Sequence, residues 1–381
     1  MGGSALANTT DATAAAINPA DLESIDSWSV TGTFAPFLPA NTAPFTPGGS
    51  THSDRGLFPL GFVGFGVRVF DKAVTGLAVY TESGAGATYS ELPELGGMSM
   101  GLQLGVIEAA LPISYAITDQ LSVGASARLG FTTISVDMPI DMGGGPMRLE
   151  QSMSGLGLPG VSAGVHYQPI ERLSLAASYR SKITMPLSGD GTATIPMLGA
   201  QPFTVESEWS TPHSFGVGAA FSVLPQQLLI STDVRYALLD NAVDNMDMTI
   251  SMQGQPTPME SALTLQWKNS FSWATGAEYR VAKLVPLRAG YCLTTSATKE
   301  EYAVALGLAP GLLHSVHAGA GVELADFAID LGAAYAFANS EVTNSVNGPP
   351  GTYSSNSILF SLSATYRPSA APARSPVASN N

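Results

Sequence analysis

Few residues of this chain have the type and spacing to do chemistry, and three arginines stand out among them. Arg128, Arg180 and Arg288 fall where a strand would turn its polar face inward. A guanidinium carries a fork of donors that matches a carboxylate bidentately, so one or two of these arginines could bind an acidic ligand. Inward charges of both signs more often pair with one another. For any single arginine we favour an ion pair within the protein.

Enzymatic and metal-binding chemistry is not indicated. The five histidines form no recognisable metal or nucleophile constellation, and His314 with His317 is a lone pair at strand or loop spacing. The single cysteine, Cys292, cannot form an intrachain disulfide, and no Cys/His spacing suggests zinc. We therefore expect a protein that is not an enzyme and that needs no cofactor or metal.

Strands with an alternating pattern must position these side chains. Between residues 121 and 129 the odd-numbered positions are apolar, and the even-numbered ones, including Arg128, are small or polar. Successive side chains of a strand point to opposite faces, so the segment has one apolar and one polar face. Residues 357–367 show the same alternation, with Tyr366 on the apolar face. Such a pattern is typical of a wall with lipid outside and a polar lumen inside.

The composition favours the same architecture and excludes nucleic acid as a partner. Charged residues are 12% of the chain and the net charge is −14, whereas about a quarter of an ordinary soluble domain is charged. No stretch reaches the roughly 18 apolar residues that a membrane helix needs. Only a closed barrel of strands satisfies its backbone hydrogen bonds in hydrocarbon without helices. The acidic balance offers no clustered lysines and arginines for a phosphate backbone.

Short and long connections alternate along the chain. Short turns lie at residues 70–72, 118–120, 169–172, 224–227, 282–285 and 325–326. Longer connections, rich in Gly, Pro, Ser and Thr, lie at residues 38–56, 83–103, 140–147, 187–202, 240–259, 295–312 and 339–356. This arrangement predicts an all-β fold, a transmembrane antiparallel β-barrel of about 14 strands with both chain ends on the periplasmic side.

Two terminal segments are expected to lie outside the barrel wall of residues 28–367. Residues 1–27 are rich in Ala, Thr and Asn and lack strand alternation, so we expect a plug in the lumen or a periplasmic arm. Residues 368–381 are predicted to be a disordered tail. No basic and apolar leader is visible at the start, so we expect that a signal peptide is missing from this chain.

The N-terminal segment contains a recognisable order of motifs. A glycine-rich start is followed by an alanine-rich stretch with Asp11, and then by the triplet Asn18-Pro19-Ala20 just before the first strand. This order resembles the plug, or hatch, of the FadL/OmpP1/TodX family of outer-membrane transporters of hydrophobic compounds. The triplet alone would be weak evidence, but it lies directly before a fourteen-strand pattern. The resemblance implies that these four residues belong to the hatch and its gating. They could instead form an ordinary helix cap or turn.

Two further segments resemble the family, and one departs from it. Residues 175–183 resemble the family's Tyr-Arg-Ser strand after the third periplasmic turn, and residues 287–291 resemble the strand that follows a later turn. The resemblance therefore spans nearly the whole chain. In residues 310–314, leucines replace charges of the family pattern, so polar ligand contacts from that loop are not carried over.

The resemblance also implies a route for the ligand. Extracellular loops capture a hydrophobic molecule, which enters an apolar pocket and leaves sideways through a gap in the wall after the hatch has moved. The gap comes from a kink in the third strand, residues 73–82. Gly84 and Gly86 follow that strand, and glycines weaken pairing and permit a bulge. The alternative is that these glycines simply begin the next long loop.

Capture needs apolar side chains in two long loops that face outward. The candidates are Leu92, Leu95, Met98, Met100 and Leu102 in the first loop, and Leu306, Leu308, Leu312 and Leu313 in the second. Exposed apolar patches usually mark a binding surface, and methionine adapts to ligands of different shape. The alternative is that the two loops pack on each other and cap the barrel.

These observations predict a monomeric channel in the outer membrane of a Gram-negative bacterium, in contact with outer-membrane lipid and lipopolysaccharide. It takes up hydrophobic molecules passively, with long-chain fatty acids as the first expectation. Aromatic or alkane hydrocarbons are the alternative ligands. A structural or adhesive barrel that transports nothing is the alternative from another functional class.

Overall fold

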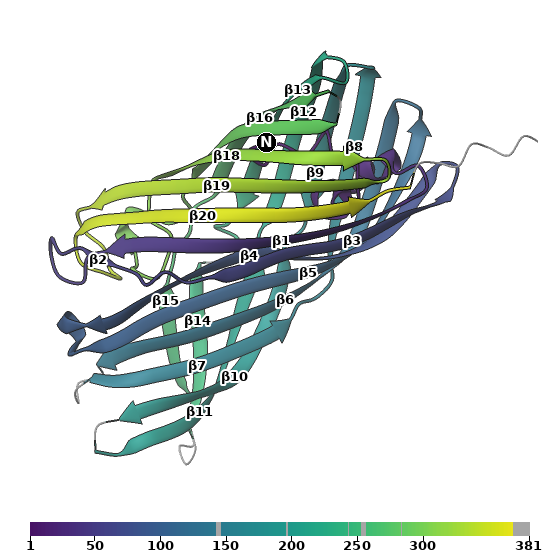
Figure 1. Ribbon diagram of the computed structural model, residues 1–381. Coiled ribbons are helices and arrows are strands. Elements are labelled where there is room, and N and C mark those ends of the chain that lie inside the picture. The colour runs from purple at the N-terminus through teal and green to yellow at the C-terminus, as the bar shows by residue number, and fades with distance from the viewer. Residues whose placement is uncertain (142–145, 196, 243, 253–256, 283, 369–381) are drawn as a thin grey trace, which may run out of the picture.

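The chain folds into one antiparallel sheet that closes on itself as a barrel (Figure 1). The computed structural model describes residues 1–141, 146–195, 197–242, 244–252, 257–282 and 284–368. The first strand, β1 (Trp28–Ala43), closes the barrel because it pairs with β3 (Phe58–Phe70) on one side and with the last strand, β20 (Gly351–Tyr366), on the other. None of the helices in the described part of the chain is long and apolar enough to cross a membrane.

Fourteen strands form the wall, as predicted. Nine of them are single elements: β1, β3, β4 (Ala73–Leu92), β5 (Met98–Thr118), β6 (Leu121–Asp141), β17 (Val285–Thr295), β18 (Leu312–Leu324), β19 (Phe327–Val342) and β20. The other five each consist of two consecutive elements: β7 (Pro146–Leu156) with β8 (Gly160–Ile170), β9 (Leu173–Arg180) with β10 (Ile183–Ile195), β11 (Gly199–Thr211) with β12 (His213–Leu224), β13 (Leu228–Leu238) with β14 (Asn245–Met252), and β15 (Met259–Thr264) with β16 (Ser270–Val281). The short strand β2 (Thr51–His52) pairs with β1.

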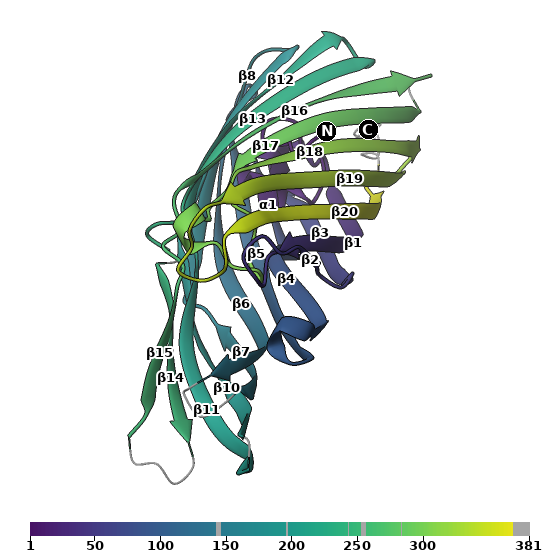
Figure 2. The ribbon, with the colours of Figure 1, turned by 90° about the vertical axis from the view of Figure 1, so that its left-hand side faces the viewer.

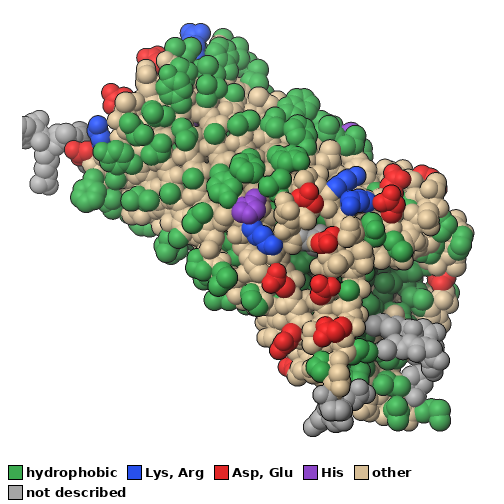
Figure 3. Space-filling view, turned by 180° about the vertical axis from the view of Figure 1, so that it is seen from behind, with side chains coloured by type: hydrophobic (Ala, Val, Ile, Leu, Met, Phe, Trp, Pro, Cys, Tyr) green, Lys and Arg blue, Asp and Glu red, His purple; other side chains and the backbone are tan. Residues whose placement is uncertain are grey.

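The predicted alternation fixes which side chains face outward. In β6, Ser122, Ser126 and Arg128 are buried, whereas Leu129, the residue after Arg128, is exposed. Hydrophobic side chains cover a broad part of the outer surface, and charged side chains gather beyond it (Figure 3). Aromatic contacts lie on the outer face near each end of the wall: Trp28–Phe65, Trp28–Tyr366 and Phe327–Tyr366 at one end, and Trp273–Tyr291 and Tyr335–Phe337 at the other. This distribution suits a wall that is surrounded by lipid.

The short turns lie where they are predicted, although residue 283 of one turn lies outside the described residues. The long connections are shorter than expected, because the strands continue into them. Strands occupy most of residues 83–103 and 187–202, and β14 lies within residues 240–259, so the prediction of loops there is wrong. Residues 142–145 of another predicted loop, and the predicted tail from residue 369, also lie outside the described residues.

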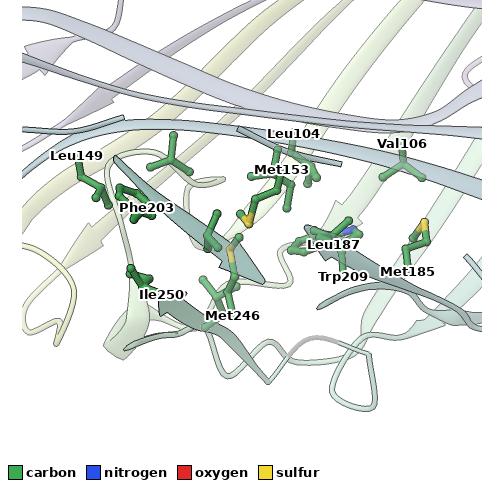
Figure 4. Packing of buried hydrophobic residues seen from close by; sticks show 14 of the residues in the cluster. Leu104, Val106, Leu149, Met153, Met185, Leu187, Phe203, Trp209, Met246 and Ile250 are labelled. Carbon is green, nitrogen blue, oxygen red and sulfur yellow. The ribbon is translucent and has the colours of Figure 1, made fainter. Parts of the chain in front are cut away.

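These continued strands form an extension of the sheet beyond the barrel. Strands β7, β10, β11, β14 and β15 pair in that order and project beyond the closed part (Figures 1 and 2). Their inner faces pack with β5 and β6 around a buried cluster that includes Met153, Met185, Phe203 and Met246 (Figure 4). The extension therefore has a hydrophobic core of its own.

The N-terminal segment lies inside the barrel (Figure 2). It contains a short helix, α1 (Ala14–Ile17), and a 3-10 helix, η1 (Pro19–Ser24). Its buried side chains, such as Leu6 and Leu22, contact inward-facing residues of the wall. Two further 3-10 helices, η2 (Pro93–Leu95) and η3 (Glu300–Tyr302), lie in connections at the opposite end.

Candidate functional site

The triplet Asn18-Pro19-Ala20 joins the two helices of the N-terminal segment. Asn18 is fully buried, and its Oδ1 accepts a hydrogen bond from the backbone N–H of Ala20 (3.2 Å). Its Nδ2 donates to the carbonyl oxygen of Leu6 (3.0 Å) and to Oδ1 of Asp21 (3.0 Å). Pro19 suits the first helical position because its nitrogen has no hydrogen to donate. Asn18 is therefore a helix cap that also ties distant parts of the segment together.

The wall holds this triplet with small residues. A Cβ on Gly124 of β6 would overlap the backbone of the triplet, and a Cβ on Gly164 of β8 would overlap the asparagine side chain. Ser114 and Ser122 both donate hydrogen bonds to the carbonyl oxygen of Ala20, at 3.1 and 3.0 Å. The two glycines thus form a slot in the wall that lets the triplet approach closely. The two serines hold the triplet in one position along the wall.

Asp21 connects the N-terminal segment to a histidine of the wall. Its Oδ1 lies 2.7 Å from Nδ1 of His166, and its Oδ2 has no hydrogen-bond partner in the described structure. Burial raises the pKa of Asp21 to about 6, although the hydrogen bond with His166 opposes the rise. Both residues line a cavity of about 620 Å³ at the end of the barrel that carries the short turns. The predicted Asp11 accepts hydrogen bonds from the backbone N–H and the hydroxyl of Thr13, two residues further along the chain.

Strand β4 contains one extra residue in the wall. Its pairing with β5 shifts by one position between Thr81 and Ser83, so Glu82 is the additional residue of a β-bulge. Before the bulge, even-numbered side chains such as Tyr80 are buried, and after it, odd-numbered side chains such as Tyr89 are buried. The bulge therefore exchanges the residues that face the lumen.

The ladder between β3 and β4 ends at the height of this bulge. Its last pair joins Phe62 with Tyr80, and the start of β3 at Phe58 has no ladder partner on β4 among the described residues. Gly84 and Gly86 lie just beyond, inside strand β4, so the alternative that they simply begin a loop is wrong. A Cβ on Gly86 would press against the ring of Phe58. The role of these glycines in opening the wall stays a prediction.

A mostly apolar cavity of about 300 Å³ lies in the lumen behind the bulge. Its apolar lining includes Leu104, Trp209, Trp267, Leu308 and Leu313. Glu82, Ser83 and Gly84 line it from β4, and Glu82 is the one charged residue among the described lining residues. Within the described residues, no group of three or more His, Cys, Asp or Glu side chains is placed to hold a metal ion.

Two of the three predicted arginines share one buried carboxylate, Glu108 of β5. Arg128 reaches both of its oxygens, at 2.9 and 2.8 Å, and Arg180 reaches one of them, at 2.7 Å. The hydroxyl of Tyr80 donates to the same carboxylate (2.7 Å). Arg180 also donates to the carbonyl oxygen of Ala16 in helix α1 (2.8 Å), so this cluster ties the wall to the N-terminal segment.

The third arginine is paired as well. Arg288 donates to Glu278 (2.7 Å) and forms an ion pair with Asp330. Arg280 donates to the same Glu278 and to Glu323, which extends the network across neighbouring strands. In this structure all three predicted arginines therefore face carboxylates of the protein.

The two predicted capture loops pack together at the end of the barrel that faces away from the short turns. Leu92 and Leu306 are almost completely buried in one cluster, and the hydroxyl of Tyr89 donates to the carbonyl oxygen of Ala305 (3.0 Å). The partly buried members of that packing are Leu95, Met100, Leu102 and Leu313, whereas Leu308 and Leu312 are exposed and Met98 is half-buried. The loops thus form a cap, and capture by their exposed residues stays a prediction.

Two features of the site are not among the sequence predictions. Glu108 is buried at the centre of the arginine cluster. It occupies an ordinary inward position in the alternating pattern of β5, so the pattern does not distinguish it from its neighbours. The methionine-rich cluster of the extension lies largely in segments that resemble loops by composition. The sequence feature that could have revealed this cluster is the even spacing of Met246, Met248 and Met252, which places them on one face of a strand.

Comparison with known proteins gives a consistent result. The family model described as outer membrane protein transport protein (OMPP1/FadL/TodX) matches residues 1–367. The structure is similar to the toluene transporter TodX of Pseudomonas putida (TM-score 0.82, 18% identity, 96% of each chain covered) and to a FadL homologue of Pseudomonas aeruginosa (TM-score 0.79, 18% identity, 96% of each chain). The toluene transporter TbuX of Ralstonia pickettii is also similar (TM-score 0.79, 17% identity, 97% of each chain). No curated protein sequence matches the chain.

Proposed function

Since the chain belongs to the OmpP1/FadL/TodX family of outer membrane transport proteins, we propose that it carries uncharged hydrophobic molecules inward by lateral release. The family consists of transport channels and not of enzymes, and it places the protein in the outer membrane of a Gram-negative bacterium. Outer-membrane lipid and lipopolysaccharide surround the wall in this proposal, and the protein acts as a monomer.

The proposed route uses the three features described above. A molecule enters past the exposed side of the loop cap, at Leu308 and Leu312, and reaches the cavity behind β4. Residues 1–27 act as a hatch below the cavity. The molecule leaves between β3 and β4, where the ladder ends and the bulge at Glu82 lies. An irregular wall at this height offers an apolar molecule a path into lipid that avoids water.

The charge of the cavity lining is the observation that favours an uncharged ligand. The described lining contains no lysine or arginine, and it contains one carboxylate. Arg128, Arg180 and Arg288, the arginines considered as partners for an acidic ligand, already have protein partners, which is the arrangement favoured for each of them. A buried carboxylate without a positive partner is strongly disfavoured. An aromatic or alkane hydrocarbon, such as the toluene named for TodX and TbuX, has no charge to compensate.

Long-chain fatty acids are the second candidate, because one cation lies near the cavity. Lys268 is exposed and directly follows the lining residue Trp267. A ligand whose acyl chain fills the cavity could hold its carboxylate at that lysine. In this case Lys268→Met would weaken oleate binding and leave toluene binding unchanged.

Uptake by proteoliposomes separates the candidates. We expect the full chain to accelerate entry of labelled toluene over empty vesicles, with a smaller effect on oleate. The reverse order favours the fatty acid, and no acceleration of either favours a structural barrel. The variants Asn18→Ala and Gly84→Val test the route, because unchanged uptake in both contradicts gating by the hatch and the wall.

A further inference from the structure

The bulge of β4 places a negative charge at the proposed exit of the cavity. Glu82 is the additional residue of the bulge, and both Glu82 and the following Ser83 line the cavity. A regular strand would turn only one of two consecutive residues to the lumen. The bulge therefore puts a carboxylate at the height where the ladder between β3 and β4 ends.

The surroundings explain how this charge is tolerated. The buried cluster of Glu108, Arg128 and Arg180 contains two positive groups and one negative group. Glu82 lies within electrostatic reach of Arg180, which it attracts. The formal charges of the four groups sum to zero. Glu82 thus contributes a negative charge near the cluster and also lines the cavity.

We propose that Glu82 determines the specificity of the channel by excluding carboxylates from the cavity, an inference that rests on the proposed function. A carboxylate in the cavity would lie near Glu82, and no described lining residue offers it a positive charge. Like charges repel more strongly in a site of low polarity than in water. A neutral molecule of the same shape does not meet this repulsion. Removal of the charge also leaves Arg180 without its second counter-charge, so an acidic ligand gains an attractive partner.

Binding of two matched ligands tests the proposal. p-Xylene and 4-methylbenzoate have similar shapes, but only the second is charged at pH 8. Two of the four tryptophans, Trp209 and Trp267, line the cavity, so their fluorescence reports binding to the purified full chain in detergent. We expect Glu82→Gln to lower the Kd of 4-methylbenzoate by about tenfold or more, the effect of about 1.4 kcal/mol, while the Kd of p-xylene stays within about twofold.

Two variants serve as controls. Glu82→Asp keeps the charge and should bind both ligands like the wild type. Glu94→Gln removes one negative charge from an exposed position in η2 and should change neither Kd. An unchanged Kd of 4-methylbenzoate in folded Glu82→Gln overturns the proposal, and so does an equal change for both ligands.

A measurement on the wild type keeps the proposal testable if the variants do not fold. The neutral 4-methylbenzamide should displace p-xylene more strongly than 4-methylbenzoate does, and equal displacement overturns the role of Glu82. A wild type that binds none of these ligands contradicts the proposed function itself. Binding of p-xylene with no discrimination against the carboxylate contradicts only the specificity.

Discussion

At the scale of single residues, the buried cluster around Glu108 should dominate stability. Glu108→Ala leaves Arg128 and Arg180 without their shared carboxylate in a buried site. Removing one partner of a buried ion pair typically costs about 3–5 kcal/mol, because the remaining charge is not compensated. We therefore expect a large loss of stability. The measured quantity is the urea concentration at the midpoint of unfolding, and the folded fraction is read from gels, on which the folded barrel and the heat-denatured chain migrate differently.

An exposed ion pair provides the comparison for this prediction. Arg148 and Asp137 form a salt bridge at 2.7 Å, and their side chains are 45% and 33% exposed. Exposed pairs contribute only about 0–1 kcal/mol. Asp137→Ala should thus shift the midpoint little. If both substitutions shift it equally, burial of the cluster does not determine its contribution.

Asp21 should make docking of the N-terminal segment depend on pH. Its pKa is about 6 in the docked segment, above the ordinary value of 3.8. A raised pKa means that the docked state favours the protonated acid, so the stabilisation is present below pH 3.8 and is lost as the pH rises through 6. His166 opposes this effect when it is charged, and the nearby Asp233 adds to it.

Proteolysis of residues 1–27 checks this dependence. We expect the wild-type segment to be cleaved faster at pH 7.5 than at pH 4.5. Asp21→Asn cannot ionise, so it should remove most of the difference. A variant that keeps the full dependence on pH would assign it to another group, such as His166.

The sequence predicted that Arg128, Arg180 and Arg288 face inward, because alternation fixes the face of each strand residue. It did not predict their partners. Glu108, Glu278 and Asp330 lie on other strands, and the pairing register brings them together. The position of a side chain along one strand contains no information about the stagger of the next.

At the scale of elements, the fit between the N-terminal segment and the wall depends on glycine. Gly124→Val should displace the segment, because a Cβ at this position overlaps backbone atoms of Pro19 and Ala20, which cannot rotate away. We expect faster proteolysis of residues 1–27 with an intact barrel. Gly32→Val is the matched control, since a Cβ on Gly32 of β1 has open space around it. Equal protection of residues 1–27 in both variants would contradict the slot.

Element boundaries were the weakest part of the sequence prediction. Gly, Pro and Thr suggest a loop at residues 187–202, yet β10 and β11 form a continuous ladder there. Backbone pairing between neighbouring strands overrides the local preference, because each residue adds hydrogen bonds that composition does not encode. The bulge at Glu82 could not be predicted for the same reason. It is a register shift between β4 and β5, and the sequence of β4 alone shows only the glycines that follow it.

At the scale of the whole molecule, the barrel itself was predictable because many weak signals agree. Low charge, alternation, and short turns separated by longer connections all favour a closed wall in lipid. The extension with its methionine-rich core was not predictable, since it depends on how strands continue beyond the membrane. The barrel of this molecule was therefore predictable from the sequence, whereas the extension of the sheet beyond it was not.

Two obstructions in series should keep the lumen closed to ions. The N-terminal segment packs inside the wall towards the end with the short turns, and the loop cap around Leu92 and Leu306 lies at the other end. Resistances in series add, so removal of one obstruction leaves the other in control. We expect neither Gly124→Val nor Leu306→Asp alone to conduct ions in a planar bilayer, whereas the double variant should.

Leu308→Asp, in the same loop but 49% exposed, is the control for the added charge. Combined with Gly124→Val, it should not open the channel. Full conductance of Gly124→Val alone would mean that the cap leaves an open path, and the lumen would then have a single gate.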